Sequence, residues 1–259
     1  MLPAASTARG GRRVLKRILY SLFTLRDAVL ILFGRAEPSL PFTVKAEPSS
    51  VYYNFAVKPE QAEAFERYIN LPAGFRLAPM RCIEGEEPRL LLTLNVYEVT
   101  GLAVGIRAEW STYIYDEDGV GRYMVLEARS SEYSMDPVDI ITKKGRVEHV
   151  MSSDAIRTVV ASNDEQLFNC TLRMHDAQPL ATIAPEWMAA NDFIYWRNGF
   201  CDRTYYGETM VNASVRQAAA ADYEIDDATH WAPFVETNPL HVLRYEGPLH
   251  FMITAWWGV

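Results

Sequence analysis

The stretch that decides the fold runs from residue 90 to residue 129 and reads LLLTLNVYEVTGLAVGIRAEWSTYIYDEDGVGRYMVLEAR. It is rich in β-branched and aromatic residues, which is typical of strands. Short turns at residues 100–101 and 116–121 divide it into three runs, 90–99, 102–115 and 123–129. Strands joined by turns this short pair in antiparallel fashion, because a parallel pair needs a long crossover.

The chain on either side of this stretch carries further strand patterns and fewer helical ones. We expect strands at residues 51–57, 146–151, 155–161, 166–174 and 240–254. We expect helices at residues 59–68, 185–196 and 215–223. The fold class predicted from these patterns is mainly β (α+β), with antiparallel strands and a few helices.

The composition is that of an ordinary folded domain. Of 259 residues, 49% are hydrophobic and 22% are charged, which excludes a disordered protein and a small disulfide scaffold. The net charge is −8, although residues 1–46 hold eight Lys/Arg against two Asp/Glu. An acidic body argues against nucleic-acid binding, which needs clustered cations. The three cysteines show no C-x-x-C spacing, and we expect them reduced, in the cytoplasm.

The first 46 residues are predicted to form a basic arm and a linker, followed by one β domain over residues 47–259. Cations in residues 12–17 precede apolar residues at helical spacing up to residue 33. The apolar run is too short to span a bilayer. Such a helix either lies on an anionic membrane surface, as a peripheral contact through residues 12–33, or packs on its own body or another subunit. Prolines in residues 37–48 indicate an extended linker.

Several signatures of cofactor chemistry are absent from the sequence. There is no G-x-G-x-x-G opening a helix after a strand, no phosphate-binding P-loop, no G-x-S-x-G and no H-E-x-x-H. The five histidines lack the spacing of a metal site. We therefore expect neither a metal nor a nucleotide cofactor.

Charged residues inside the strands are the best candidates for a site. Alternation puts Arg107, Glu109 and Tyr113 on one face of their strand. In a regular hairpin, Glu127 and Arg129 of the next strand join them in one ionic patch. If the apolar face packs, these charges are solvated cross-strand pairs. If instead the polar face lines a lumen, a buried carboxylate there can act as an acid or base.

The preceding strand supplies two further candidates for substrate binding, Tyr97 and Glu98. Tyr97 alternates with Glu98, so the two side chains face opposite sides of the sheet. Both can line one cavity only if the strand contains a bulge.

The first half of the domain resembles the acetoacetate decarboxylase-like superfamily. The resemblance rests on the order of VYYNF at 51–55, the proline-started helix, LPAGF at 71–75 and the strands at 90–97 and 105–110. It covers residues 51–174. It implies an antiparallel, cone-shaped β-barrel around an apolar cavity, in homo-oligomers.

The resemblance also implies a chemistry. In that family a lysine forms a Schiff base with the substrate carbonyl, and a second lysine beside it lowers its pKa. The adjacent lysines here are Lys143 and Lys144, which follow Glu127 at a longer interval than in the family. Either one of them is the amine after a longer loop, or the pair is an exposed turn and the Schiff-base chemistry is lost.

The resemblance further implies a glutamate and an arginine that position the substrate. Glu98 and Glu109 both fit the glutamate by order, whereas no arginine stands at the start of the first strand, at residues 50–51. Arg107 is the candidate arginine from the strand pattern. The predicted function is a lyase acting on a small apolar carbonyl or carboxylate compound. The alternative is a non-catalytic carrier for an apolar ligand.

Overall fold

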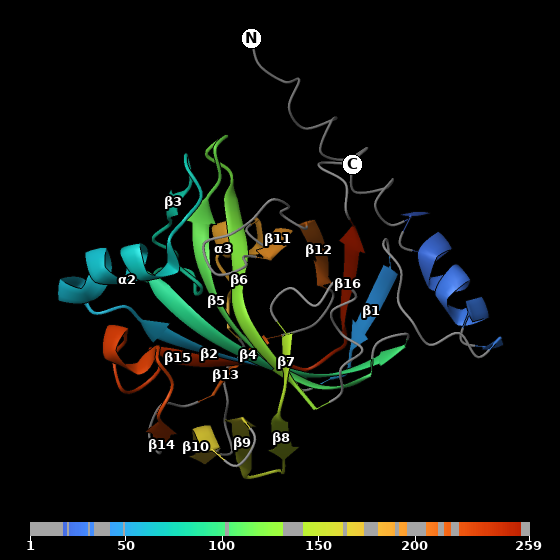
Figure 1. The fold of residues 1–259 in the computed structure, drawn as a ribbon. Coiled ribbons are helices and arrows are strands. Elements are labelled where there is room, and N and C mark those ends of the chain that lie inside the picture. The colour runs from blue at the N-terminus through green and yellow to red at the C-terminus, as the bar shows by residue number, and fades with distance from the viewer. Residues whose placement is uncertain are drawn as a thin grey trace.

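The fold is described from a computed structural model of the chain. The residues it describes are 18–19, 21–30, 32–33, 42–48, 50–101, 104–131, 142–162, 165–173, 181–189, 192–195, 206–211, 215–218 and 223–254. Antiparallel strands dominate this part of the chain, and its helices are short (Figure 1). The mainly β fold expected from the sequence is confirmed.

The larger of two sheets has twelve strands and contains residues 90–129 as three successive strands. Its members are β1 (Phe42–Ala46), β2 (Val51–Ala56), β3 (Arg76–Leu77), β4 (Leu91–Gly101), β5 (Gly105–Tyr115), β6 (Gly121–Ser130), β7 (Thr142–Lys144), β11 (Asp192–Tyr195), β12 (Tyr206–Val211), β13 (Val215–Ala218), β15 (His241–Tyr245) and β16 (Leu249–Thr254).

Seven of these strands pair in a cycle. β4 pairs with β1, β1 with β16, β16 with β12 and β12 with β11. β11 pairs with β6, β6 with β5, and β5 with β4 again. Within the cycle only the β11–β6 pairing is parallel. The hydrogen bonding thus returns to the strand at which it starts, and the sheet is strongly curved (Figure 1).

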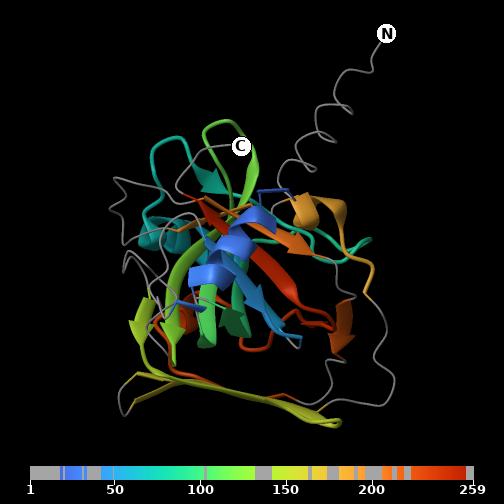
Figure 2. The ribbon, with the colours of Figure 1, turned by 90° about the vertical axis from the view of Figure 1, so that its right-hand side faces the viewer.

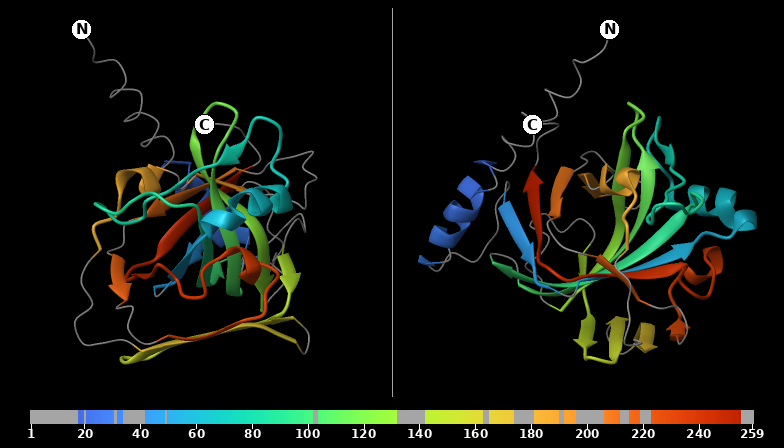
Figure 3. Two further views of the ribbon diagram at one scale, coloured as in Figure 1. Left: turned by 90° about the vertical axis from the view of Figure 1, so that its left-hand side faces the viewer. Right: turned by 180° about the vertical axis from the view of Figure 1, so that it is seen from behind.

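The smaller sheet packs against the convex side of the larger one. It contains β8 (Arg146–Met151), β9 (Ala155–Ser162), β10 (Glu165–Arg173) and β14 (Tyr223–Asp227) in the order β14-β10-β9-β8. It lies below the large sheet when the molecule is seen from behind (Figure 3, right). Tyr53 of β2 joins the two sheets, because its hydroxyl is 2.8 Å from Thr158 Oγ1 and its ring packs against Phe168.

Each strand in the middle of the large sheet therefore has two buried faces. The outer face, which packs on the small sheet, carries Tyr53, Leu92 and Trp110. The inner face carries Tyr52 and Tyr113 in a second buried cluster. Period-2 alternation separates the two sets along every strand. Polar residues on the inner face are thus enclosed by the curved sheet and by the segments that cover it.

The helices are shorter than the sequence patterns predict. α2 (Ala62–Ile69) follows the 3-10 turn η1 (Pro59–Gln61) and buries Phe65 and Ile69, as expected for residues 59–68. The helix expected at 185–196 is only α3 (Pro185–Ala189), and β11 follows it. The prediction of a helix at 215–223 is wrong at both ends, because residues 215–218 form β13 and residue 223 begins β14. Pairing of β13 with β15 overrides the helical propensity of its sequence.

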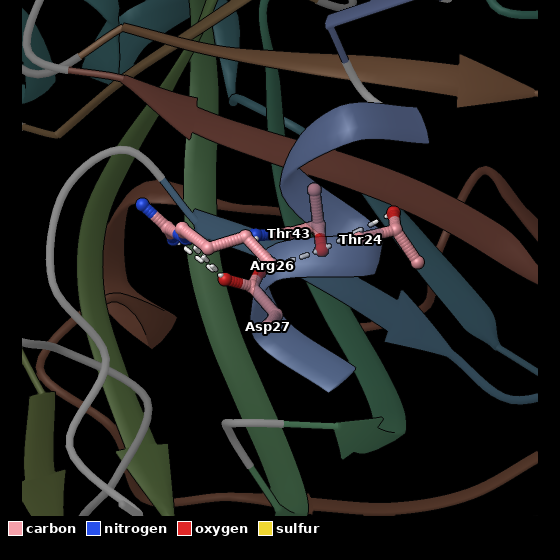
Figure 4. A network of polar contacts seen from close by, with 4 residues as sticks. All are labelled: Thr24, Arg26, Asp27 and Thr43. Carbon is pink, nitrogen blue, oxygen red and sulfur yellow. Dashed lines mark hydrogen bonds and ion pairs between the residues drawn. The ribbon is translucent and has the colours of Figure 1, made fainter. Parts of the chain in front are cut away.

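The N-terminal helix, at residues 21–30, is attached to the sheet by a buried carboxylate. Asp27 is 4% exposed, and its Oδ2 accepts hydrogen bonds from the backbone N–H and the hydroxyl of Thr43, both at 2.8 Å. Arg26 donates to Asp27 Oδ1, and the Thr24 and Thr43 hydroxyls are 3.4 Å apart (Figure 4). The helix therefore sits outside the large sheet, against β1 (Figure 2).

Part of the expected linker belongs to the sheet. Residues 42–46 form β1, which pairs with β16 and with β4, so they are not an extended linker. Residues 12–17 of the expected arm lie outside the described residues. Within the described ranges, no helix has the length and apolar composition needed to cross a membrane.

Candidate active site

The candidate site is centred on a buried ion pair on the inner face of β5. Arg107 and Glu109 are 1% and 4% exposed, so they are not solvated surface charges. Arg107 Nε donates to Glu109 Oε1 over 2.5 Å. Asn95 lies opposite Glu109 on β4, and its Nδ2 is 3.5 Å from Glu109 Oε2. The apolar face of β5 packs on the small sheet, and the polar face is enclosed as well, so both faces of the strand are buried.

The expected four-residue patch is not formed, because β6 contains a bulge. Between Trp110 and Ser111 of β5 the register shifts, so that Glu127 lies opposite Trp110 and Val125 opposite Ser111. The extra residue on the bulged strand turns the side chains after it to the other face. Glu127 and Arg129 consequently lie on the outer face, away from Arg107 and Glu109.

The outer-face charges form a separate group. Arg129 Nη2 is 3.0 Å from Glu127 Oε1, and His230 Nε2 is 3.3 Å from Glu127 Oε2. His230 in turn packs against the rings of Tyr68 and Trp231. This group links β6 to the segment after β14 and is separated from the inner face by the sheet itself.

The two candidates on β4 also lie on opposite sides. Tyr97 is buried on the inner face, with Arg107 opposite it on β5. Glu98 is exposed on the other face, and β4 pairs regularly with β5 on both sides of it. Without a bulge in β4, Glu98 does not reach the group around Glu109.

Aromatic side chains share the inner face with the ion pair. Tyr113 lies against Tyr123 of β6, and Trp187 of α3 donates its indole N–H to the Tyr113 hydroxyl. Tyr52 packs edge-on against Trp187. Burial raises the pKa of Tyr52 far above its usual value, and the negative charge of Glu109 raises it further. Burial likewise raises the pKa of Tyr113 and Tyr123, so these phenols remain protonated at neutral pH.

The lysine pair is placed by the short strand β7, which runs parallel to β6. Lys143 lies beside Arg129, and Lys144 lies beside Ser130, which itself faces Arg107 across β5 and β6. Lys144 is exposed. The side chain of Lys143 lies outside the described residues. Lys144 on β7, Ser130 on β6 and Arg107 on β5 therefore lie in one row across the three strands.

Four inner-face residues were not among the predicted site residues, although alternation places Ser111 on the face of Glu109: Asn54, Thr93, Ser111 and His241. All four are buried, and they face the same side as Glu109. The sequence carried a signal at Asn54, which is a lone amide in the strand VYYNFA, whereas the strands of the other three contain further polar or charged residues. The sequence did not reveal that these strands are neighbours, because β15 lies almost two hundred residues beyond β2.

Among the described residues, no group of three His, Cys, Asp or Glu side chains is close enough to hold a metal ion. Protein-family models and curated protein sequences give no match to the chain. Solved structures do match it.

The acetoacetate decarboxylase of Legionella pneumophila superposes with a TM-score of 0.58 at 8% identity, over 85% of this chain and 86% of that one. The chain has the acetoacetate decarboxylase-like fold. An acetoacetate decarboxylase-like enzyme from Sphingomonas wittichii gives a TM-score of 0.50 at 12% identity, over 82% of this chain and 90% of that one. A third match is the enduracididine biosynthesis enzyme MppR, in its complex with the condensation product of pyruvate and imidazole 4-carboxaldehyde. Its TM-score is 0.50 at 10% sequence identity, over 84% of this chain and 87% of that one.

The resemblance noted over residues 51–174 therefore holds for the fold, and it extends well beyond that segment. In this fold β5 carries the ion pair and β4 carries Asn95 opposite Glu109, while the aromatic residues come from β2, β5, β6 and α3. At identities of 8–12% the likeness concerns the backbone, and the site must be interpreted from this chain's own residues.

Proposed function

We propose that the chain is an acetoacetate decarboxylase-like enzyme, a carbon–carbon lyase acting on a small apolar carbonyl or carboxylate compound. The substrate binds against the inner face of the large sheet, inside a cone-shaped barrel formed by the seven-strand cycle. The cyclic pairing from β4 round to β5 supports this enclosure.

One observation carries the proposal: the buried Arg107–Glu109 pair adjoins inner-face polar atoms that lack partners. Asn95 Oδ1, Ser111 Oγ and Tyr123 OH have no hydrogen-bond partner among the described residues. Each such buried atom costs about 1–3 kcal/mol of stability. Since native proteins satisfy almost all buried polar atoms, a cluster of unsatisfied ones beside a buried ion pair favours a binding site.

The two charged groups have complementary roles in the proposed reaction. The planar guanidinium of Arg107 suits a substrate carboxylate, which it can bind through two parallel N–H groups. On decarboxylation, the electron pair of the broken C–C bond passes into the adjacent carbonyl or imine, and the resulting carbon takes up a proton. The reaction consumes one proton from solvent, and Glu109 is placed to take up that proton and pass it to the carbon as a general acid.

Two alternatives remain for the mechanism: a lysine forms a Schiff base with the substrate, or the reaction proceeds without one. If Lys143 or Lys144 forms a Schiff base, borohydride reduction in the presence of a keto acid traps a covalent adduct on that lysine, because reduction fixes the imine. Peptide mass spectrometry then identifies the modified residue. If no adduct forms and activity survives Lys→Met at both positions, the reaction proceeds without a Schiff base.

One observation favours the alternative of a non-catalytic carrier. None of the lysines whose side chains the structure describes is buried on the inner face: Lys45 and Lys144 are exposed, and Lys58 is partly exposed. A carrier needs the enclosed site without the amine. It predicts saturable binding of an apolar carboxylate with no turnover and no borohydride adduct.

The test of the proposal compares two glutamates that each pair with an arginine two residues away in sequence. We expect Glu109→Gln to abolish turnover of acetoacetate, because the amide cannot pass on a proton, whereas Glu127→Gln, on the outer face, keeps both turnover and binding. Release of carbon dioxide and isothermal titration calorimetry report the two properties, with circular dichroism to confirm folding. Unchanged turnover in Glu109→Gln would overturn the proposal.

The remaining expectations concern the surroundings of the enzyme. We propose that it forms homo-oligomers, as the family resemblance implies, and that it lies in the cytoplasm, as the cysteines without C-x-x-C spacing indicate. Size-exclusion chromatography with light scattering measures the mass in solution, and cell fractionation measures the location.

A further inference from the structure

A row of polar residues crosses the inner face next to the Arg107–Glu109 pair. His241 of β15 lies opposite Asn54 of β2, Asn54 opposite Thr93 of β4, and Thr93 opposite Ser111 of β5. Residues directly opposite one another on neighbouring strands share a face. Each of the four side chains is at most 1% exposed. We call them the polar row.

The polar row keeps few of its hydrogen bonds to itself. Thr93 Oγ1 donates to Asn54 Oδ1 over 2.6 Å. Asn54 Nδ2, Ser111 Oγ and both ring nitrogens of His241 have no hydrogen-bond partner among the described residues. The row therefore presents donors and acceptors to the interior at three of its four positions.

The row is continuous with the candidate active site. Thr93 and Ser111 each lie two residues from Asn95 and Glu109 on the same strands and the same face. Two residues of an antiparallel strand span about 7 Å. A ligand lying along β4 and β5 can therefore touch Glu109 at one end and the polar row at the other.

The row carries no formal charge at neutral pH. Its members are an amide, two hydroxyls and an imidazole, and burial lowers the pKa of His241 to about 4. Glu86 Oε2 lies 3.6 Å from His241 Nδ1, so the nearest charge on that side is negative. An anionic group would be desolvated there without a cation to balance it, whereas an uncharged polar group would find both donors and acceptors.

We propose that the polar row is a second subsite, which binds an uncharged polar group such as an amide, a hydroxyl or a second carbonyl of the same substrate. This rests on the proposed function, because the other end of the substrate is the carboxylate held at Arg107 and Glu109. The substrate is then a carboxylate whose far end, about 7 Å away along the strand, is polar and uncharged.

The test uses three six-carbon carboxylates that differ only at the far end: hexanoate ends in a methyl group, adipic acid monoamide in an amide, and adipate in a second carboxylate. Isothermal titration calorimetry on the full chain measures each Kd. We expect the monoamide to bind about tenfold more tightly than hexanoate, because it satisfies buried partners that hexanoate leaves unpaired. Adipate should bind more weakly than the monoamide.

Two variants and a control assign the preference to the row. Ser111→Ala and His241→Leu should each bring the Kd ratio of hexanoate to monoamide from about ten towards one, because each removes a buried partner that the monoamide satisfies and hexanoate leaves unpaired. Thr112→Val is the matched control, because its buried hydroxyl lies next along β5 on the other face and donates to the Leu91 carbonyl. That variant should keep the full preference.

The outcomes separate the subsite from the proposed function. If hexanoate and the monoamide bind the unaltered chain equally, or if the preference survives both variants, the subsite is overturned while the proposed function stands. If none of the three carboxylates binds, Arg107 and Glu109 do not hold a carboxylate. The proposed function is then overturned, and the subsite is overturned with it.

Discussion

The Arg107–Glu109 pair can serve the fold or the site, and a comparison of single and double variants distinguishes the two. Removing one partner of a buried ion pair leaves an uncompensated charge, so Glu109→Gln should lower the free energy of unfolding by about 3–5 kcal/mol. The double variant Arg107→Met/Glu109→Leu removes both charges and should unfold within about 1 kcal/mol of the unaltered chain. Urea denaturation measures both.

If the double variant regains stability but does not bind ligand, the ion pair serves ligand binding and is not needed for folding. If the double variant is as unstable as the single one, the pair is part of the fold. The double variant also supplies a folded protein for the binding experiments where Glu109→Gln is too unstable.

At the same scale, His241 predicts a pH dependence of stability. Its pKa is lowered from 6.5 to about 4 in the fold by burial, so between these values the unfolded chain binds a proton that the folded chain does not. Its contribution to stability is therefore complete above about pH 6.5 and is lost as the pH falls towards 4, by up to about 3 kcal/mol.

The comparison of the unaltered chain with His241→Leu isolates this effect from other groups. Urea denaturation between pH 4 and 7 should give a shallower dependence of the free energy of unfolding on pH in the variant. Parallel curves for the two proteins would mean that His241 is protonated in the fold as readily as in the unfolded chain.

Single residues also show where prediction from the sequence stops. Alternation correctly placed Arg107, Glu109 and Tyr113 on one face. It failed for Glu127 and Arg129, because no glycine or proline marks the bulge between Val125 and Glu127. Nor could alternation tell which face is enclosed, since the small sheet buries the apolar face and the curved large sheet buries the polar one.

At the scale of elements, the N-terminal helix has one face fixed to β1 and another without a described partner. Asp27 faces β1, whereas Leu22, Leu25 and Val29 are among its exposed apolar residues. The sequence predicted either membrane contact or subunit contact for this arm, and both use such a face. We expect the full chain to sediment with anionic vesicles, and more weakly as the salt concentration rises.

A pair of variants tests whether the helix makes that contact. Leu25→Glu should abolish sedimentation, while Val150→Glu, at a similarly exposed apolar position on β8, should not. Equal sedimentation of both variants would contradict the membrane contact. If no vesicles bind and Leu25→Glu lowers the mass in light scattering, the helix contacts another subunit.

Strand connections were easier to predict than strand partners. The hairpins β4–β5 and β5–β6 followed from short turns, and Asp116 stabilises the second turn by accepting hydrogen bonds from the N–H groups of Asp118 and Val120. The expected strand at 240–254 is two strands, because residues 246–248 separate β15 from β16. β13 was expected as a helix, since its pairing with β15 is not local in sequence.

At the scale of the whole molecule, β1 closes the cycle of strands between β4 and β16. A chain that begins at residue 34 loses the helix but keeps β1, and we expect it to fold cooperatively. A chain that begins at residue 47 leaves the edges of β4 and β16 unpaired, which exposes them to aggregation. Soluble yield and thermal unfolding compare the two, and equal stability would mean that β1 is not needed to close the sheet.

The central claim is that the inner face of the curved sheet holds a carboxylate at Arg107 and Glu109. A crystal structure of the full chain grown with acetoacetate tests it most directly. We predict ligand density on the inner face, with the carboxylate within hydrogen-bond distance of the Arg107 guanidinium and the carbonyl near Glu109. Density only elsewhere, or an inner face filled by protein side chains with no ligand at a saturating concentration, would contradict it.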